Sequence, residues 1–152
     1  MRGAPPPPAT ALSLERSLPA PPEAVYAAWT DPVVIGEWMS PLGYAVAEVD
    51  LRVGGTFRIV MVGQDTRIEH SGQYLELEPP RRLRFTWRSP YTGDLPSVVT
   101  VSFERDGDGT RLTLTHERLP ADVMTSHASG WGAMIDRMAE LLRAKSVDEV
   151  GP

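Results

Sequence analysis

The sequence predicts an α+β fold in which a curved antiparallel sheet wraps around one long C-terminal helix. Between Tyr44 and Glu117, apolar and polar residues alternate with a period of two, which is typical of strands with one buried face. Beyond this region, apolar residues recur at spacings of three and four, which places them on one face of a helix. These are Trp131, Met134, Ile135, Met138, Leu141 and Leu142. Such a helix can cover the open face of the sheet, and a cavity remains wherever the two layers do not interdigitate.

The composition is that of one globular domain. The chain has 152 residues, of which 41% are hydrophobic and 23% charged, so it is long enough to bury a substantial core. Its formal net charge of -5 argues against non-specific binding of nucleic acid, which requires a basic field. The absence of cysteine excludes disulfides and thiolate metal sites. No apolar run is long enough to span a bilayer, so we expect no membrane insertion. The first residues lead into prolines and not into a signal peptide, and we expect a cytoplasmic protein.

The N-terminal part predicts a tail, a strand and two short helices. Residues 1–10 contain four consecutive prolines and are expected to form a disordered, proline-rich tail. Residues 11–18 alternate as a first strand. A helix is expected over residues 23–30. Asp31 followed by Pro32 is a start signal for a second helix, because Asp caps the exposed amide groups and Pro fits the first helical position.

Six further strands are expected, separated by turn signals. They cover residues 44–51, 56–62, 67–78, 81–89, 97–105 and 110–117. Residues 107–109 read Gly-Asp-Gly, a signal for a tight hairpin between the last two strands. The long helix is expected over residues 122–145, with a frayed tail at 147–152, so the folded domain spans residues 11–146. The order of strand, two short helices, six strands and long helix is the helix-grip arrangement.

Several motifs, in a fixed order along the chain, carry a family resemblance. The segment 21–32 reads PPEAVYAAWTDP and is similar to the opening signature of the START-like (SRPBCC) superfamily. The later motifs are Trp38, 51–57 (LRVGGTF), 72–76 (GQYLE), 79–83 (PPRRL), 85–87 (FTW), 109–116 (GTRLTLTH) and 127–131 (HASGW). Together they resemble the branch named after the activator of the ninety-kilodalton heat-shock protein ATPase. The resemblance runs from about Leu12 to Arg143, nearly the whole chain.

The resemblance implies a START-like helix-grip domain and three candidate functions. Superfamily members typically bind hydrophobic ligands between the sheet and the long helix, and they include lipid carriers, hormone receptors, polyketide cyclases and aromatases. We therefore expect a small hydrophobic or aromatic ligand. The alternatives are an enzyme of cyclase or aromatase type that uses the same cavity, and a protein-interaction module similar to the branch's co-chaperone domain. The branch has no invariant catalytic set that could be transferred to this chain, and we expect no cofactor. Monomer and homodimer both fit the sequence.

The candidate site residues are those with large apolar or imidazole side chains on the faces expected to meet the cavity. They are Trp38, Met39, Phe57, Met61, His70, Trp87, His127 and Trp131. His127 precedes Trp131 by four residues, so it shares a helix face with it and could orient a ligand. The tryptophans are explained equally well as core residues. No HxH or HExxH spacing joins the histidines, including His116, and we expect no metal site.

Two glycines, Gly130 and Gly132, fall inside the predicted long helix, where each costs about 1 kcal/mol relative to Ala. A structural interpretation is close packing of the helix on the sheet beside Trp131. A functional interpretation is space for a ligand.

Overall fold

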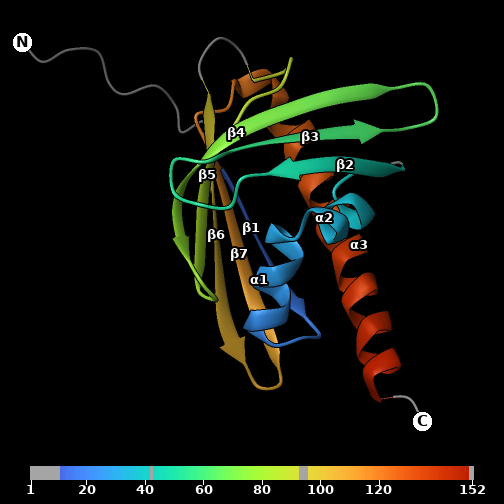
Figure 1. Cartoon of the computed structure of the whole chain (residues 1–152). Helices are drawn as coiled ribbons and strands as arrows, with labels where there is room; N and C mark the ends of the chain where they lie inside the picture. Colours follow the sequence, from blue (N-terminus) through green and yellow to red (C-terminus); the bar gives the residue numbers. More distant parts are fainter. Residues whose placement is uncertain (1–10, 42, 93–95, 151–152) are drawn as a thin grey trace, which may run out of the picture.

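A computed structural model describes residues 11–41, 43–92 and 96–150, with the side chains of residues 146–150 left out of the description. The strands are β1 Leu12–Leu18, β2 Tyr44–Val49, β3 Thr56–Val62, β4 Arg67–Glu78, β5 Arg82–Trp87, β6 Ser97–Asp106 and β7 Gly109–Glu117. The helices are α1 Pro22–Thr30, α2 Pro32–Trp38, the short 3-10 turn η1 Ala121–Val123 and α3 Met124–Val150. The strands form one antiparallel sheet in the order β1-β7-β6-β5-β4-β3-β2 (Figure 1).

The sheet curves around α3, which confirms the predicted fold class. In Figure 1, α1 lies between the β6–β7 part of the sheet and α3, and α2 lies against β2. The sequence and the structure differ at the last helix. A 3-10 turn precedes it, and the α-helix continues past Lys145 to Val150, so residues 147–150 continue α3 where a frayed tail is expected. The expected tail at residues 1–10 and the last two residues lie outside the described residues.

One residue, Asp31, ends α1 and begins α2. Its backbone N–H donates to the carbonyl oxygen of Ala27, which closes the last turn of α1. Its side-chain Oδ1 accepts the N–H of Val33 at 2.9 Å, and Pro32 occupies the first position of α2. The Asp-Pro pair therefore acts as the sequence predicts, because it satisfies an exposed amide and presets the backbone for a helix.

Aromatic rings from four elements form the centre of the core. Trp29 of α1 stacks on Trp131 of α3 with ring centroids 5.8 Å apart, and Trp131 meets Trp87 of β5 at 5.2 Å. Trp38 of α2 packs edge-on against Trp29 at 4.8 Å. All four indoles are at most 2% exposed. The helices are thus held to the sheet through one continuous aromatic cluster.

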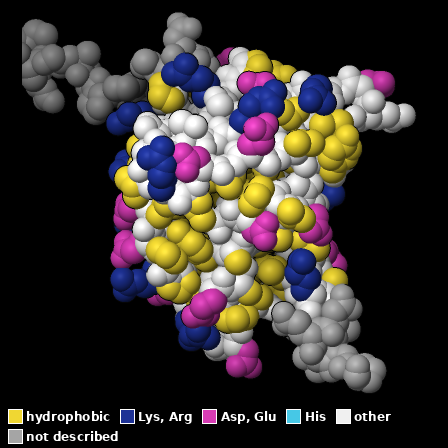
Figure 2. All heavy atoms as spheres, viewed as in Figure 1, with side chains coloured by type: hydrophobic (Ala, Val, Ile, Leu, Met, Phe, Trp, Pro, Cys, Tyr) yellow, Lys and Arg dark blue, Asp and Glu magenta, His cyan; other side chains and the backbone are white. Residues whose placement is uncertain are grey.

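The surface carries charges of both signs. On the face shown in Figure 2, basic and acidic side chains are interspersed without a large field of one sign. Several of these charges form ion pairs, including Arg58 with Glu69 at 2.8 Å and Arg105 with Glu23 at 3.1 Å. Within residues 11–41, 43–92 and 96–150, no helix is both long enough and apolar enough to cross a membrane.

The middle of β4 tolerates only glycine at position 72. A Cβ at Gly72 would overlap the carbonyl oxygen of Thr86 and the ring of Phe57. We predict that Gly72→Ala lowers the free energy of unfolding by about 1–3 kcal/mol, because the packed strand and ring must move apart. Urea denaturation measures this change.

The matched control is Gly130→Ala on α3, where a Cβ meets no heavy atom within 4 Å. This variant should be more stable than the parent chain by up to about 1 kcal/mol, since Ala favours a helix over Gly. Equal stability of Gly72→Ala and the parent chain would show that β3, β4 and β5 can separate at no cost.

Candidate functional site

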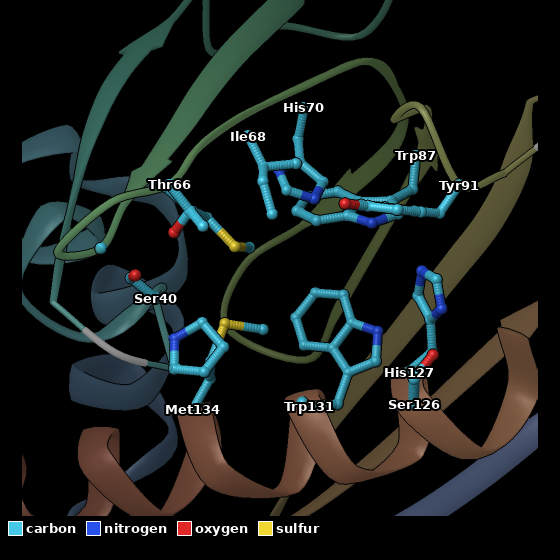
Figure 3. A pocket seen from close by; sticks show the side chains of 14 residues that line it. Ser40, Thr66, Ile68, His70, Trp87, Tyr91, Ser126, His127, Trp131 and Met134 are labelled. Atoms are coloured by element: carbon cyan, nitrogen blue, oxygen red, sulfur yellow. The ribbon is translucent and has the colours of Figure 1, made fainter.

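A cavity of about 360 Å³ lies between the sheet and the first half of α3. Sheet-side residues come from β3, β4, β5 and the loops beside them, and helix-side residues come from α3, with the segment after α2 closing one end (Figure 3). The fourteen lining residues are Ser40, Pro41, Met61, Gly63, Thr66, Ile68, His70, Trp87, Tyr91, Ser126, His127, Gly130, Trp131 and Met134. The volume falls at the small end of the range for small-molecule sites, about 300–1,000 Å³.

Local periodicity explains why these side chains converge. On α3, His127, Gly130, Trp131 and Met134 are spaced by three and four residues, so they share the face that meets the sheet. On β4, alternate residues point to the same face, and Ile68 and His70 both reach the cavity.

Five of the eight residues proposed from the sequence lie at the cavity wall. These are Met61, His70, Trp87, His127 and Trp131. The other three, Trp38, Met39 and Phe57, lie in the core instead.

The packing of α2 against α1 and the sheet explains this difference. Trp38 is fully buried, and its Nε1–H donates to the carbonyl oxygen of Ala28 in α1 at 2.8 Å, so its indole is held against α1 and does not line the cavity. Met39 and Phe57 border a separate gap of only about 10 Å³. A gap of this size is too small for an organic ligand.

The remaining wall residues were not singled out from the sequence as ligand-binding candidates. Met134 and Ser126 share the helix face of Trp131 and His127, so the helical spacing could have found them. Thr66 and Tyr91 lie outside the strands and helices, and no periodic signal places them at the cavity.

A buried hydrogen-bond chain stands behind the two wall tryptophans. The Nε1–H of Trp131 donates to Nδ1 of His116 at 3.0 Å. Because an indole N–H can only donate, the ring proton of neutral His116 is on Nε2, which donates to Oγ of Ser97 at 2.7 Å. The Ser97 hydroxyl donates in turn to the carbonyl oxygen of Trp87 at 2.6 Å. Each polar hydrogen in this series of three hydrogen bonds has an acceptor, and the series fixes the Trp131 indole in one orientation.

Two histidines beside the cavity are held neutral by burial. Burial lowers the pKa of His116 to about 3 and the pKa of His70 to about 4, with a smaller contribution to each from the nearby His127. His70 is 6% exposed, and its ring lies against that of Trp87 with centroids 4.7 Å apart. Its Nδ1 has no hydrogen-bond partner among the described residues. His70 therefore brings an uncharged, partly unsatisfied polar ring to a mostly apolar wall.

His127 lies at the helix side of the cavity (Figure 3). Its Nδ1 pairs with the carbonyl oxygen of Val123 at 2.9 Å, so Nδ1 is the donor nitrogen. In the neutral ring, Nε2 is then the acceptor. In the described part of the chain, no three His, Asp or Glu residues gather closely enough to hold a metal ion.

The curved sheet, the helix across it and the cavity between them define a START-like protein of the helix-grip class. Residues 19–143 match the family model described as Activator of Hsp90 ATPase homolog 1-like protein, and the chain belongs to this family. The resemblance found in the sequence motifs is thereby confirmed.

Solved structures share this fold over most of the chain. Protein CV1439 from Chromobacterium violaceum is 30% identical with a TM-score of 0.76, covering 87% of this chain and 96% of that one. CalU16 from Micromonospora echinospora is 28% identical with a TM-score of 0.69, covering 91% and 79%. PFC0360w, an HSP90 activator from Plasmodium falciparum, is 27% identical with a TM-score of 0.66, covering 80% and 86%. No curated protein matches the chain.

The depressed pKa values of His70 and His116 predict a loss of stability in mild acid. Below about pH 6.5, His70 and His116 bind protons in the unfolded chain but stay neutral in the folded chain. The free energy of unfolding therefore falls as the pH falls. The expected slope is about 1.4 kcal/mol per pH unit for each histidine, down to the folded pKa of about 4 for His70 and about 3 for His116. Urea denaturation between pH 7 and pH 5 measures the slope.

The variant His116→Leu should reduce this slope by about half, because one of the two histidines is removed. It should also lower stability at pH 7 by about 1–3 kcal/mol, because the Trp131 Nε1–H loses its acceptor, whereas the Ser97 hydroxyl still donates to the carbonyl oxygen of Trp87. An unchanged slope in this variant would mean that His116 takes up its proton over the same pH range in the folded and the unfolded chain.

Proposed function

We propose that the protein binds one small apolar or aromatic molecule in the cavity between the sheet and α3. The observation that carries the proposal is an apolar wall that faces unfilled space. Its side chains are Pro41, Met61, Ile68, Trp87, Trp131 and Met134. Apolar surface of this kind gains free energy when a ligand removes it from water, and the two methionines can adapt to the shape of the ligand.

The few polar groups at the same wall support a site that orients its ligand. His70 lies on the sheet side, Tyr91 lies above Trp131, and Ser126 and His127 lie on the helix side (Figure 3). Small-molecule sites commonly combine an apolar lining with a small number of placed polar groups. The related structures support the fold of this chain. The proposal of a ligand rests on the residues that line the cavity of this chain.

A second candidate is an enzyme of cyclase or aromatase type in the same cavity. His70 favours it, because its ring lies in the cavity wall and its Nδ1, which has no partner among the described residues, can form a hydrogen bond with a bound substrate. This function needs turnover of the bound molecule, which product analysis after incubation with each ligand would reveal. Binding without any chemical change leaves the first proposal standing alone.

A third candidate is a protein-interaction module like a co-chaperone. The family match and the likeness to an HSP90 activator favour it. So do the exposed side chains of Tyr44 and Val46 on the edge strand β2, which are 56% and 48% exposed. Stimulation of the ATPase activity of a purified ninety-kilodalton heat-shock protein would support it, and loss of that stimulation in Val46→Lys would locate the surface.

Gly130→Leu provides a clean test of the cavity. Gly130 lines it, and a Cβ there meets no heavy atom within 4 Å, so a leucine should project into the cavity and occupy part of its volume. We predict that apolar and aromatic ligands that raise the melting temperature of the parent chain do not raise that of Gly130→Leu. At a hundredfold excess over Kd, a ligand stabilises the parent chain by about 2.7 kcal/mol.

The control is Ser129→Leu, at the preceding, exposed position of α3, which does not line the cavity. It should bind as the parent chain does. Trp131→Phe separates effects on ligand binding from effects on stability less well, because it changes the cavity wall and also removes the hydrogen-bond donor to His116. Equal binding by Gly130→Leu and the parent chain would place the ligand elsewhere.

A further inference from the structure

The cavity wall contains no formal charge. Among the described residues that line it, none is Asp, Glu, Lys or Arg. The guanidinium of Arg137 lies close behind one end, where it donates to the carbonyl oxygens of Ser40 and Glu37 and is not part of the wall. A carboxylate in the cavity would thus lose its hydration without meeting an opposite charge, which is costly in an apolar site.

Burial keeps the imidazoles from supplying that charge. His70, at the wall, and His116, behind Trp131, both have a pKa well below that of an exposed histidine because they are removed from water. The third imidazole, His127, is half-buried at the helix side of the cavity.

Aromatic faces border the cavity on two sides. On the sheet side, the rings of His70 and Trp87 lie 4.7 Å apart at an angle of 31°. On the helix side, Trp131 presents its indole, with its centroid 5.2 Å from that of Trp87. Tyr91, from the loop after β5, reaches over the same space (Figure 3). Trp87 and Trp131 contact each other and are 2% and 1% exposed, whereas Tyr91 is 53% exposed. A flat aromatic molecule can therefore stack on Tyr91 and meet the tryptophan cluster edge to face.

Hydrogen-bonding groups lie around this apolar slot. They are the imidazoles of His70 and His127 and the hydroxyl groups of Thr66, Tyr91 and Ser126. All of them can exchange a hydrogen bond with a neutral hydroxyl group. The wall can therefore hold a polar but uncharged substituent.

We propose that the cavity selects uncharged, planar aromatic molecules that carry a hydroxyl or similar hydrogen-bonding group, and that it rejects carboxylates of the same ring system. This inference rests on the proposed function and names the class of ligand for that site. It joins three observations: a wall without Asp, Glu, Lys or Arg, aromatic rings among the lining residues, and hydrogen-bonding side chains around them.

The test compares 2-naphthol, naphthalene and 2-naphthoate at pH 8, with the dissociation constants followed by tryptophan fluorescence and confirmed by calorimetry. A phenol-type hydroxyl is protonated at this pH, and the naphthoate is an anion. We expect 2-naphthol to bind most tightly and 2-naphthoate to bind at least about tenfold more weakly. Gly130→Leu should abolish binding of all three.

A designed cation should reverse the selectivity. Thr66 is exposed and lines the cavity, so Thr66→Lys places an ammonium group at the wall without disturbing the core. This variant should gain about tenfold in affinity for 2-naphthoate relative to 2-naphthol. The matched control is Gln64→Lys, an exposed position in the same turn that does not line the cavity, and it should behave as the parent chain.

The outcomes distinguish binding in the cavity from selection against carboxylates. If the parent chain binds 2-naphthoate as tightly as 2-naphthol and Gly130→Leu blocks both, the cavity is the site and the charge selection is overturned. If Thr66→Lys and Gln64→Lys gain equally for 2-naphthoate, the anion binds outside the cavity and the selection is again overturned. If none of the three probes binds the parent chain, the proposed function fails together with this inference.

Discussion

The hydrogen bond from the indole of Trp131 to His116 joins the long helix to the sheet, and the shape of the cavity depends on it. His116 donates a hydrogen bond to Ser97 on β6, and Ser97 donates one to the backbone carbonyl oxygen of Trp87 on β5. In a dry interior an unpaired donor costs about 1–3 kcal/mol, so rotation of the Trp131 indole away from His116 is disfavoured. The chain of bonds thereby fixes the distance between helix and sheet at the point where the cavity begins.

The same arrangement separates polar from apolar surface. The polar atoms of His116 and Ser97 are buried behind the tryptophans and satisfied there, and the indole faces and methionine side chains remain for the cavity. Burial removes the charge that His70 and His116 could carry. Under the function that we propose, recognition at this site depends on ring shape and on neutral hydrogen bonds, since an ionic ligand finds no Asp, Glu, Lys or Arg at the wall.

Family membership accounts for the fold, whereas the binding properties of the cavity depend on the residues that line it. The relatives share the curved sheet and crossing helix at identities near 30%. A fold of this kind hosts different activities, because function depends on the side chains that face the cavity. In this chain those side chains include aromatic rings, methionines and uncharged polar groups, and this combination supports the small-molecule site that we propose.

The sequence by itself determined the order of the elements and which faces turn inward. The period of two along β3 to β7, the spacing of Trp131 and Met134, and the Asp31-Pro32 pair each act locally, so they could be interpreted without a structure. Only the tertiary structure decided which inward-facing residues border unfilled space. Met39 and Phe57 turn inward as expected but are covered by neighbours. Thr66 and Tyr91 come from turns and loops that the fold brings to the cavity. Periodicity records the direction of a side chain, whereas a cavity depends on what packs against it from distant parts of the chain.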